Sequence, residues 1–397
     1  MKRTLLALSL IAIAPLSAYS DTEIEPCCFD IRCDWTFSVE AEFLYWSVRE
    51  TNLPFAAVVD IVSRNSTVPD VPDLALIQDL KFLKTKWDPG FRVGFDWNIG
   101  CDGWDIFSTW TYFFNKSSSS IHRSFPGLQP ALGESGVVNP WINFTAQGMF
   151  PIQPALPIFE DVSAKWRLYF NQIDLALGKK YWLNDCFAIK PYAGLRGVWN
   201  RTHFNTEGSQ GPKDTSNPTL AISDFFNEAS TRWNAKQWAI CLLVGVEPDW
   251  YFTNNFSLFA NFDLAMGWGN FHQRFHEKYI ISGNGGPGGP PGTEGPFVII
   301  DEKNSYKERF STMATLLDLA LGLRWEQTWG CDDRYLTALD LGWEQHIWFD
   351  VANRVMTFGT DTETSTGGEQ TQTFTGFIDN IGNLVFGGLM VRLSFQW

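Results

Sequence analysis

The sequence has few features of a helical membrane protein or of a nucleic-acid-binding protein. After the first 20 residues it contains no run of 18 apolar residues, so no transmembrane helix is expected in the rest of the chain. Basic residues are scarce, with 30 Lys and Arg against 44 Asp and Glu, and the formal charge of −14 would repel the phosphates of a nucleic acid. Aromatic residues make up 16% of the chain, which excludes disorder over most of its length. Two classes remain: a soluble all-β protein, and a barrel that meets lipid with alternate residues.

Residues suited to catalysis are also scarce. The chain has five histidines and no Gly-x-Ser-x-Gly motif, which would form the strained turn that presents a hydrolase nucleophile. His272 and His276 are four residues apart, but their segment has a strand or loop pattern, so the metal-binding geometry of a helix does not apply. The sequence therefore predicts no enzyme, no metal site and no cofactor.

The N-terminus has the parts of a secretory signal peptide. Lys2 and Arg3 precede the apolar run at 5–14, and Ala18 and Ser20 supply small residues where a signal peptidase reads. The run is too short for a membrane anchor. We expect residues 1–20 to be a signal peptide, residues 21–34 to be a periplasmic segment that contains cysteines, and residues 35–397 to form one domain.

Apolar residues recur at every second position from Trp35 onward, which is the pattern of a β-strand with one apolar face. Phe91, Val93 and Phe95, for example, alternate with Arg92, Gly94 and Asp96. Ten such segments are predicted, at 35–49, 86–100, 104–114, 164–178, 187–201, 232–247, 256–270, 308–326, 334–349 and 383–397.

The connections between these segments alternate between short and long. Short turns lie near Cys101, 184–185, 253–255 and 331–333, and long loops cover 50–85, 115–163, 202–231, 271–307 and 350–382. An outer-membrane barrel has this arrangement, with short periplasmic turns and long extracellular loops. The fold class is therefore predicted as all-β, a transmembrane antiparallel barrel of about ten strands. Twelve strands remain an alternative if the loop 115–163 contains a hairpin at 137–145.

The last segment ends on an aromatic residue inside a strand, as expected if it pairs with the first strand and closes the barrel. Tryptophans near segment ends are expected to form the two interfacial girdles: Trp35, Trp46, Trp104, Trp182, Trp199 and Trp348. Apolar residues at 74, 77, 80 and 83 predict a short amphipathic helix over 73–84. The Gly- and Pro-rich run at 284–296 predicts an exposed loop.

Four stretches stand out among the predicted strands: AEFLYW at 41–46, WDPGFRVG at 87–94, YFNQIDLALG at 169–178 and KPYAGLRGVW at 190–199. These stretches resemble the strands of the Legionella/Chlamydiales-type major outer membrane protein family. The resemblance covers nearly the whole mature chain, strands better than loops, and implies a pore-forming protein of the bacterial outer membrane. Trp397 stands where Phe is commoner in barrels. Because an aromatic end is kept, Phe395 and Trp397 are expected to form the signal read by the barrel assembly machinery.

If the apolar face of each strand meets lipid, the residues of opposite parity point into the lumen. The charged residues predicted there are Glu40, Glu42, Arg92, Asp96, Asp105, Asp174, Lys190, Arg196, Lys236, Asp263, Asp318, Arg324, Glu326, Asp340, Glu344 and Arg392. The excess of carboxylates predicts a mild preference for cations. A second interpretation is that opposite charges pair across the lumen and plug it. Ten strands enclose a narrow tube in either case.

Six of the seven cysteines fall on the periplasmic side of this barrel. Cys27, Cys28 and Cys33 precede the first strand, and Cys101, Cys186 and Cys331 lie in short turns. In an oxidising compartment they are disulfide candidates, which would either staple the barrel base or link neighbouring proteins. The pairing stays open, as does the alternative of scattered free thiols, and the odd total leaves at least one thiol unpaired or intermolecular.

Together these patterns predict a porin that contacts outer-membrane lipid, passes small solutes or ions by diffusion and contributes to envelope structure, with oligomeric or disulfide-linked partners. The alternative function is a surface adhesin whose long loops bind a host receptor. Ten-stranded outer-membrane proteases carry acidic and histidine residues at the external rim, which Asp263, His272 and His276 imitate only loosely.

Overall fold

The computed structural model of the chain describes residues 36–64, 72–99, 104–125, 134–142, 158–214, 222–285, 296–330, 334–360 and 374–397. No helix in these ranges is long and apolar enough to cross a bilayer. Several predictions lie outside the described residues: the signal peptide, the segment 21–34 with its three cysteines, Trp35, Cys101, Cys331 and most of the run 284–296.

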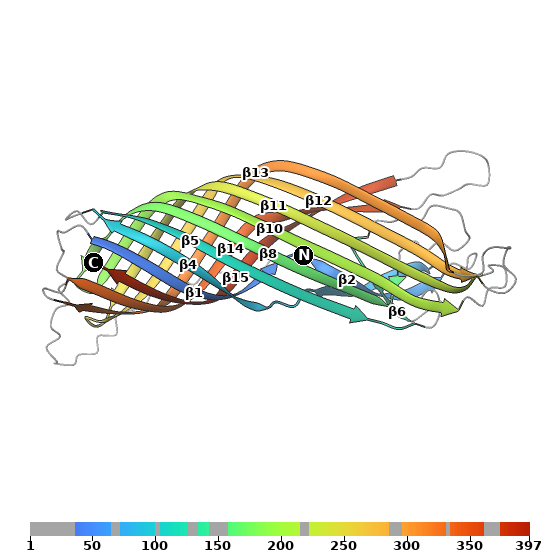
Figure 1. Ribbon diagram of the computed structural model, residues 1–397, viewed down its shortest axis with the longest axis horizontal. Coiled ribbons are helices and arrows are strands. Elements are labelled where there is room, and N and C mark those ends of the chain that lie inside the picture. The colour runs from blue at the N-terminus through green and yellow to red at the C-terminus, as the bar shows by residue number, and fades with distance from the viewer. Residues whose placement is uncertain are drawn as a thin grey trace.

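Ten long strands of the described ranges form one closed antiparallel barrel (Figure 1). They are β1 (Thr36–Glu50), β4 (Trp87–Asn98), β5 (Trp104–His122), β8 (Asp161–Lys179), β10 (Phe187–Asp214), β11 (Ile222–Tyr251), β12 (Phe256–Gly285), β13 (Pro296–Trp329), β14 (Tyr335–Thr360) and β15 (Phe374–Gln396). A short strand, β9 (Tyr181–Asn184), pairs with the start of β10 at the turn after β8. The prediction of an all-β barrel with about ten strands is confirmed.

The first and last strands close the barrel. β15 pairs with β1 from the pair Ser38–Gln396 to the pair Glu50–Leu384. Two backbone hydrogen bonds between Phe37 and Trp397, of 3.1 and 3.0 Å, extend this seam to the last residue. The chain therefore ends inside the sheet, which leaves no open edge.

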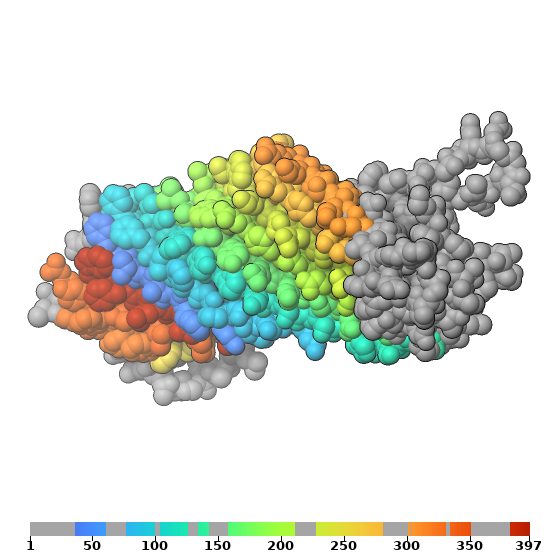
Figure 2. All heavy atoms as spheres, turned by 45° about the vertical axis from the view of Figure 1, so that its right-hand side comes forward, coloured from blue at the N-terminus to red at the C-terminus, as the bar shows by residue number. Residues whose placement is uncertain are grey.

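The outer face of the wall carries a continuous apolar band. Alternation turns residues such as Phe43, Leu175, Leu242, Leu321 and Leu341 outward, and these five are between 51% and 69% exposed. Figure 2 shows the unbroken wall that the neighbouring strands present from this side. An exposed apolar band of this extent is stable only against lipid, because water would disfavour it.

Several strands run much further than the sequence pattern predicts. β10, β11, β12 and β13 have 28, 30, 30 and 34 residues, so most of the expected loops 202–231, 271–307 and 350–382 is strand. A membrane-spanning strand needs only about 9–11 residues. Beyond the apolar band the outward residues are polar, as at Arg201, His203 and Asn205, so the apolar alternation that marks a strand disappears there.

The segments expected as the first two long loops form a second, four-stranded sheet. Its strands are β2 (Pro54–Arg64), β3 (Pro72–Phe82), β6 (Ser135–Val138) and β7 (Ile158–Phe159), in the order β3-β2-β6-β7. The helix predicted over 73–84 is therefore wrong. β3 pairs with β2 through several register shifts, one of which passes over Gln78. Ile77 and Leu80 are 65% and 44% exposed, so the helix-like spacing does not mark a buried face. β6 belongs to this sheet, so the described part of 137–145 adds no strand to the barrel.

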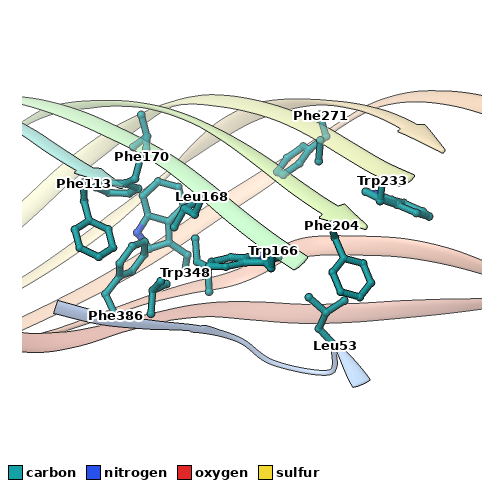
Figure 3. Close-up of a cluster of buried hydrophobic side chains, with 14 of the residues drawn as sticks. Leu53, Phe113, Trp166, Leu168, Phe170, Phe204, Trp233, Phe271, Trp348 and Phe386 are labelled. Atoms are coloured by element: carbon teal, nitrogen blue, oxygen red, sulfur yellow. The ribbon is translucent and has the colours of Figure 1, made fainter. Parts of the chain in front are cut away.

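The main hydrophobic core lies inside the barrel. In Figure 3, Phe113, Phe170, Trp348 and Phe386 point toward one another from the inner wall. Leu53, at the start of the second sheet, belongs to the same buried cluster. The core therefore fills the part of the barrel on the side of the long hairpins.

Candidate functional site

A ladder of alternating charges crosses five neighbouring strands on the inner wall. The residues in direct cross-strand register, from β13 through β14, β15 and β1 to β4, are Arg324, Asp340, Arg392, Glu42 and Arg92. Arg324 Nε donates to Asp340 Oδ1 over 2.9 Å, and Arg392 Nε donates to Glu42 Oε1 over 2.7 Å. Asp340 and Glu42 are 0% and 3% exposed, a burial that carboxylates tolerate only when they are paired.

The ladder continues across the lumen through Arg92. Its Nη1 and Nη2 donate to the two carboxylate oxygens of Glu344 on β14, over 2.9 and 3.0 Å. In the barrel, β4 and β14 are separated by β1 and β15, so this pair spans the interior instead of joining neighbours. His346, two residues further along β14, has its Nε2 2.9 Å from Glu344 and its Nδ1 2.8 Å from Asp318.

A second arginine gathers three carboxylates on the other side of the lumen. Arg196 on β10 donates from Nε and Nη2 to Asp174 on β8, over 2.7 and 2.8 Å. Its Nη1 pairs with Asp263, at 3.1 Å, and with Asp318 on β13. Since Asp318 also contacts His346, the two arginine clusters form one network. We call it the lumen diaphragm, and its members are Glu42, Arg92, Asp174, Arg196, Asp263, Asp318, Glu344 and His346.

A cavity of about 900 Å³ extends from the short-turn rim of the barrel to the diaphragm. Thr253, Asn254 and Arg334 line its mouth, and Arg92 and Arg196 line its deep end. Among the described residues that line it, eleven are carboxylates and seven are lysine or arginine. Partial pairing occurs along its wall, as between Lys190 Nζ and Asp96 at 3.3 Å and between Lys180 Nζ and Asp249 at 3.3 Å. The cavity is thus polar and net negative.

On the other side of the diaphragm the lumen is filled by aromatic rings. We call Trp46, Phe113, Phe170, Trp348 and Phe386 the aromatic plug; each is at most 4% exposed. The Trp46 ring lies 4.7 Å from the His346 ring, and Phe170 lies 4.9 Å from Phe386. Further out, Trp141, beside the second sheet, packs against Phe204 of the barrel wall at 5.6 Å.

The structure places almost all of the predicted lumen residues on the inner wall. These are Glu40, Glu42, Arg92, Asp96, Asp105, Asp174, Lys190, Arg196, Asp263, Asp318, Arg324, Glu326, Asp340, Glu344 and Arg392. Lys236 is the exception and corrects the prediction. It is exposed and shares its outward parity with Trp238, which is 49% exposed, whereas Ala235 and Ala239 face the interior. Lys236 lies above the apolar band, where polar side chains point outward.

The expected tryptophan girdle also needs correction. Trp104 and Trp199 lie on the outer face as predicted, 40% and 41% exposed, but Trp46 and Trp348 point inward and are 1% and 4% exposed. Trp182 is half-buried and lines the cavity. Strand parity would have placed Trp46 correctly, since it is out of phase with the outward residues Phe43 and Tyr45.

Sequence reasoning missed His346 as a member of the diaphragm, although it has the same parity as Glu344 and Asp340. It also missed Lys180, Glu247 and Asp249 along the cavity. The signal for Glu247 and Asp249 was the inward parity of Cys241 and Leu243 on the same strand. Lys180 gives no such signal because it lies in the turn between β8 and β9.

The described cysteines lie in different environments. Cys186 is half-buried in the turn between β9 and β10, where its backbone N–H donates to Asn184 Oδ1 over 3.0 Å. Cys241 is buried on the inner face of β11 and is unpaired. The disulfides stay a prediction, because the other candidates lie outside the described ranges.

Asp263, His272 and His276 do not form a protease-like cluster. Asp263 is buried in the diaphragm, whereas His272 and His276 have the opposite parity on β12 and face outward. In the part of the chain that the structure describes, no group of three or more His, Cys, Asp or Glu could hold a metal ion.

The family model described as the Legionella pneumophila major outer membrane protein precursor matches residues 32–393. The chain belongs to this family. This major outer membrane protein homologue is therefore an outer-membrane β-barrel, and by the rule for such barrels its short-turn rim faces the periplasm and its long hairpins face outward. No curated protein matches the chain.

Solved outer-membrane barrels resemble this major outer membrane protein homologue only in general form. The outer membrane protease OmpT from Escherichia coli has 9% identity and a TM-score of 0.34, with 93% of this chain and 98% of that chain covered. The toluene transporter TbuX from Ralstonia pickettii has 8% identity and a TM-score of 0.25, with 94% and 92% covered. The toluene transporter TodX from P. putida has 10% identity and a TM-score of 0.23, with 94% and 92% covered.

Proposed function

We propose that this barrel is a narrow pore for small cations, and that the lumen diaphragm limits its conduction. The observation that carries the proposal is the charged cavity of about 900 Å³ enclosed by a wall whose outer face is apolar. Such a cavity gives hydrated ions a polar environment at membrane depth.

The charge balance of the cavity supports a pore that is selective for cations over anions. Eleven carboxylates face seven lysine and arginine side chains among the described residues of its lining. A negative potential inside a low-dielectric wall raises the local concentration of cations and lowers that of anions.

The diaphragm and the aromatic plug narrow the lumen, which supports the proposal that the conductance is low. Both are built from side chains of the barrel wall, so opening either of them needs changes of rotamer and no break in a barrel strand. Arg92 is the most direct obstacle, because it reaches from β4 to Glu344 on β14. Removing the Arg92 side chain still leaves a partner for each of the two carboxylates that it contacts. Glu42 keeps Arg392 at 2.7 Å, and Glu344 keeps His346 at 2.9 Å.

Planar bilayer recording of the purified, folded full chain tests the proposal. We expect discrete conductance steps in the wild type, and a reversal potential in a KCl gradient that has the sign for cations. Arg92→Ala should give larger steps with stronger cation preference. Arg123→Ala removes the same type of side chain from an exposed position outside the lumen and should leave both quantities unchanged. Silent bilayers with both the wild type and Arg92→Ala would refute the proposal, as would anion selectivity.

Surface attachment is a second candidate function, favoured by the length of β10 to β13. Strands of 28 to 34 residues continue well beyond the roughly 9–11 residues that span a bilayer, so a large part of the wall stands outside the membrane. Replacing residues 215–221, which connect β10 to β11 in the sequence, and residues 286–295, which connect β12 to β13, with short Gly-Ser linkers should reduce attachment to host cells and leave conductance intact. Unchanged attachment would exclude these two connections as an adhesive surface.

A further inference from the structure

The outer face of the barrel carries three successive rows of cationic side chains. Each row follows direct cross-strand pairs through β5, β8, β10, β11, β12 and β13. The first row is Phe114, Tyr169, Arg201, Lys236, His272 and Arg309; the second is Lys116, Arg167, His203, Asn234, Arg274 and Lys307; the third is Ser118, Lys165, Asn205, Arg232, His276 and Ser305. We call these eighteen positions the cationic rows.

The charge of this surface is opposite to that of the protein as a whole. The cationic rows hold nine lysine or arginine residues and three of the five histidines, whereas none of the eighteen positions, all of them described, holds a carboxylate. The whole chain has 44 acidic residues and a formal charge of −14. The nine lysine and arginine side chains are exposed on the outer face, so mutual repulsion is left for an external anion to relieve.

The cationic rows lie directly above the lipid-facing band. The adjoining row toward the membrane contains Trp199 and Trp238, which are 41% and 49% exposed. The row beneath it contains Ile240, Trp268 and Met313, which are 58% to 61% exposed. Tryptophan concentrates at the boundary between acyl chains and headgroups, so the cationic rows stand at the headgroup level of the outer leaflet.

The surface is large enough to contact several anionic groups of one headgroup at once. Six strands about 4.8 Å apart span about 24 Å, and three rows two residues apart cover about 13 Å along the strands. Arginine forms bidentate pairs with phosphate oxygens. The Asn and Ser side chains of the rows add neutral donors and acceptors that suit sugar hydroxyls.

The apolar rows below favour a lipid over a soluble polyanion. A phosphorylated glycolipid of the outer leaflet places its phosphates and its acyl chains in the same order as the cationic rows and the apolar band. A sulfated polysaccharide would use the cations alone, whereas the adjoining Trp and Ile side chains meet acyl chains of the outer leaflet, whose own headgroups lie at the level of the cationic rows. We propose that the cationic rows are a binding site for the phosphorylated sugar headgroup of an outer-leaflet glycolipid whose acyl chains lie along the apolar band.

The test is a titration of the purified, detergent-solubilised full chain with bisphosphorylated lipid A, read by native mass spectrometry. The wild type should bind it, with an affinity that falls as salt rises because exposed charges are screened. The variant Arg201→Gln/Lys236→Gln/Arg274→Gln should bind about a hundredfold more weakly, since each surface cation contributes about a factor of five.

A matched control separates this site from general electrostatics. Arg49→Gln/Arg123→Gln/Lys179→Gln also removes three positive charges, all outside the cationic rows, and should bind like the wild type. Lipid A without phosphates should bind the wild type as weakly as bisphosphorylated lipid A binds the first variant. Heat-dependent mobility on gels checks that both variants are folded.

Three results would overturn the proposal. The first is equal affinity of the two triple variants for bisphosphorylated lipid A. The second is equal binding of the phosphorylated and dephosphorylated lipids to the wild type, which would assign binding to the acyl chains alone. The third is binding of heparin or inorganic phosphate by the wild type with no binding of lipid A, which would assign the rows to a soluble anion.

Discussion

Arg92 and Glu344 face each other across the lumen and form a bidentate ion pair, with Nη–Oε distances of 2.9 and 3.0 Å. Their strands are separated by β15 and β1, so the pair links two parts of the wall that are not neighbours. Two parallel hydrogen bonds fix the orientation of the guanidinium as well as its distance. The pair therefore acts as a cross-brace that also narrows the passage.

Arg92→Lys separates the shape of this brace from its charge. Lysine keeps the positive charge but offers no planar fork, so the bidentate bond is lost while the net charge of the lumen stays the same. We expect a larger single-channel conductance and an unchanged reversal potential in planar bilayers. Glu344→Gln removes a carboxylate and should instead reduce the preference for cations. If Arg92→Lys shifted the reversal potential as far as Glu344→Gln does, conduction would not be limited by the shape of the brace.

Arg196 is the only cation that contacts Asp174, Asp263 and Asp318 together among the described residues, and it is 2% exposed. Arg196→Gln leaves these carboxylates crowded and short of a counter-charge. Removing one partner from a buried ion-pair network costs about 3–5 kcal/mol. The free energy of unfolding in urea, followed by tryptophan fluorescence, should fall by that amount at neutral pH.

Arg167→Gln is the matched control for this loss, because Arg167 is exposed on the outer face of β8. It should change the unfolding free energy by less than about 0.5 kcal/mol. Equal effects of the two substitutions would show that the Arg196 network contributes no special stability.

Phe386 connects several rings of the aromatic plug. It is fully buried and lies within 6.0 Å of Trp46, Phe113 and Phe170, measured between ring centroids. Phe386→Ala should cost about 3–5 kcal/mol through lost burial and the cavity left behind. It should also increase conductance, because the cavity opens on the path beyond the diaphragm. Phe43→Ala removes a ring from the lipid-facing side, where Phe43 is 55% exposed, and should leave conductance unchanged.

The fold was largely predictable because strand alternation survives wherever one face meets lipid. Phe91, Val93 and Phe95 mark such a face without any knowledge of neighbours. The partners of the inward charges were not predictable. Which carboxylate meets Arg92 depends on strand register and on the curvature of the closed wall, and a slip of one residue would turn every side chain to the other face.

The two kinds of error have one physical cause. Above the apolar band the outer face meets headgroups and water. Polar residues therefore point outward there and apolar residues point inward, which is the reverse of their arrangement in the lipid-facing part of the strands. The polarity of Lys236 therefore predicts a lumen position, although the side chain points outward. The aromatic character of Trp46 predicts a surface position, although the interior on this side is apolar. Parity counted from the lipid-facing part of each strand gives the correct direction for both.

Two glycines on β10 give a sharp test of the strand packing. A Cβ at Gly194 would clash with the carbonyl oxygen of Leu175 and lie 2.5 Å from Cα of Ala176 on β8, whereas a Cβ at Gly197 would lie 3.9 Å from its nearest neighbour, the Ile173 carbonyl oxygen. Gly194→Ala must therefore push the two backbones apart and should cost about 1–3 kcal/mol or more, as overpacking does. Gly197→Ala should be tolerated. The folded fraction after refolding into detergent, read from heat-dependent gel mobility, should fall for the first variant only. Equal folded fractions would mean that β8 and β10 are not as closely paired at Gly194 as the register requires.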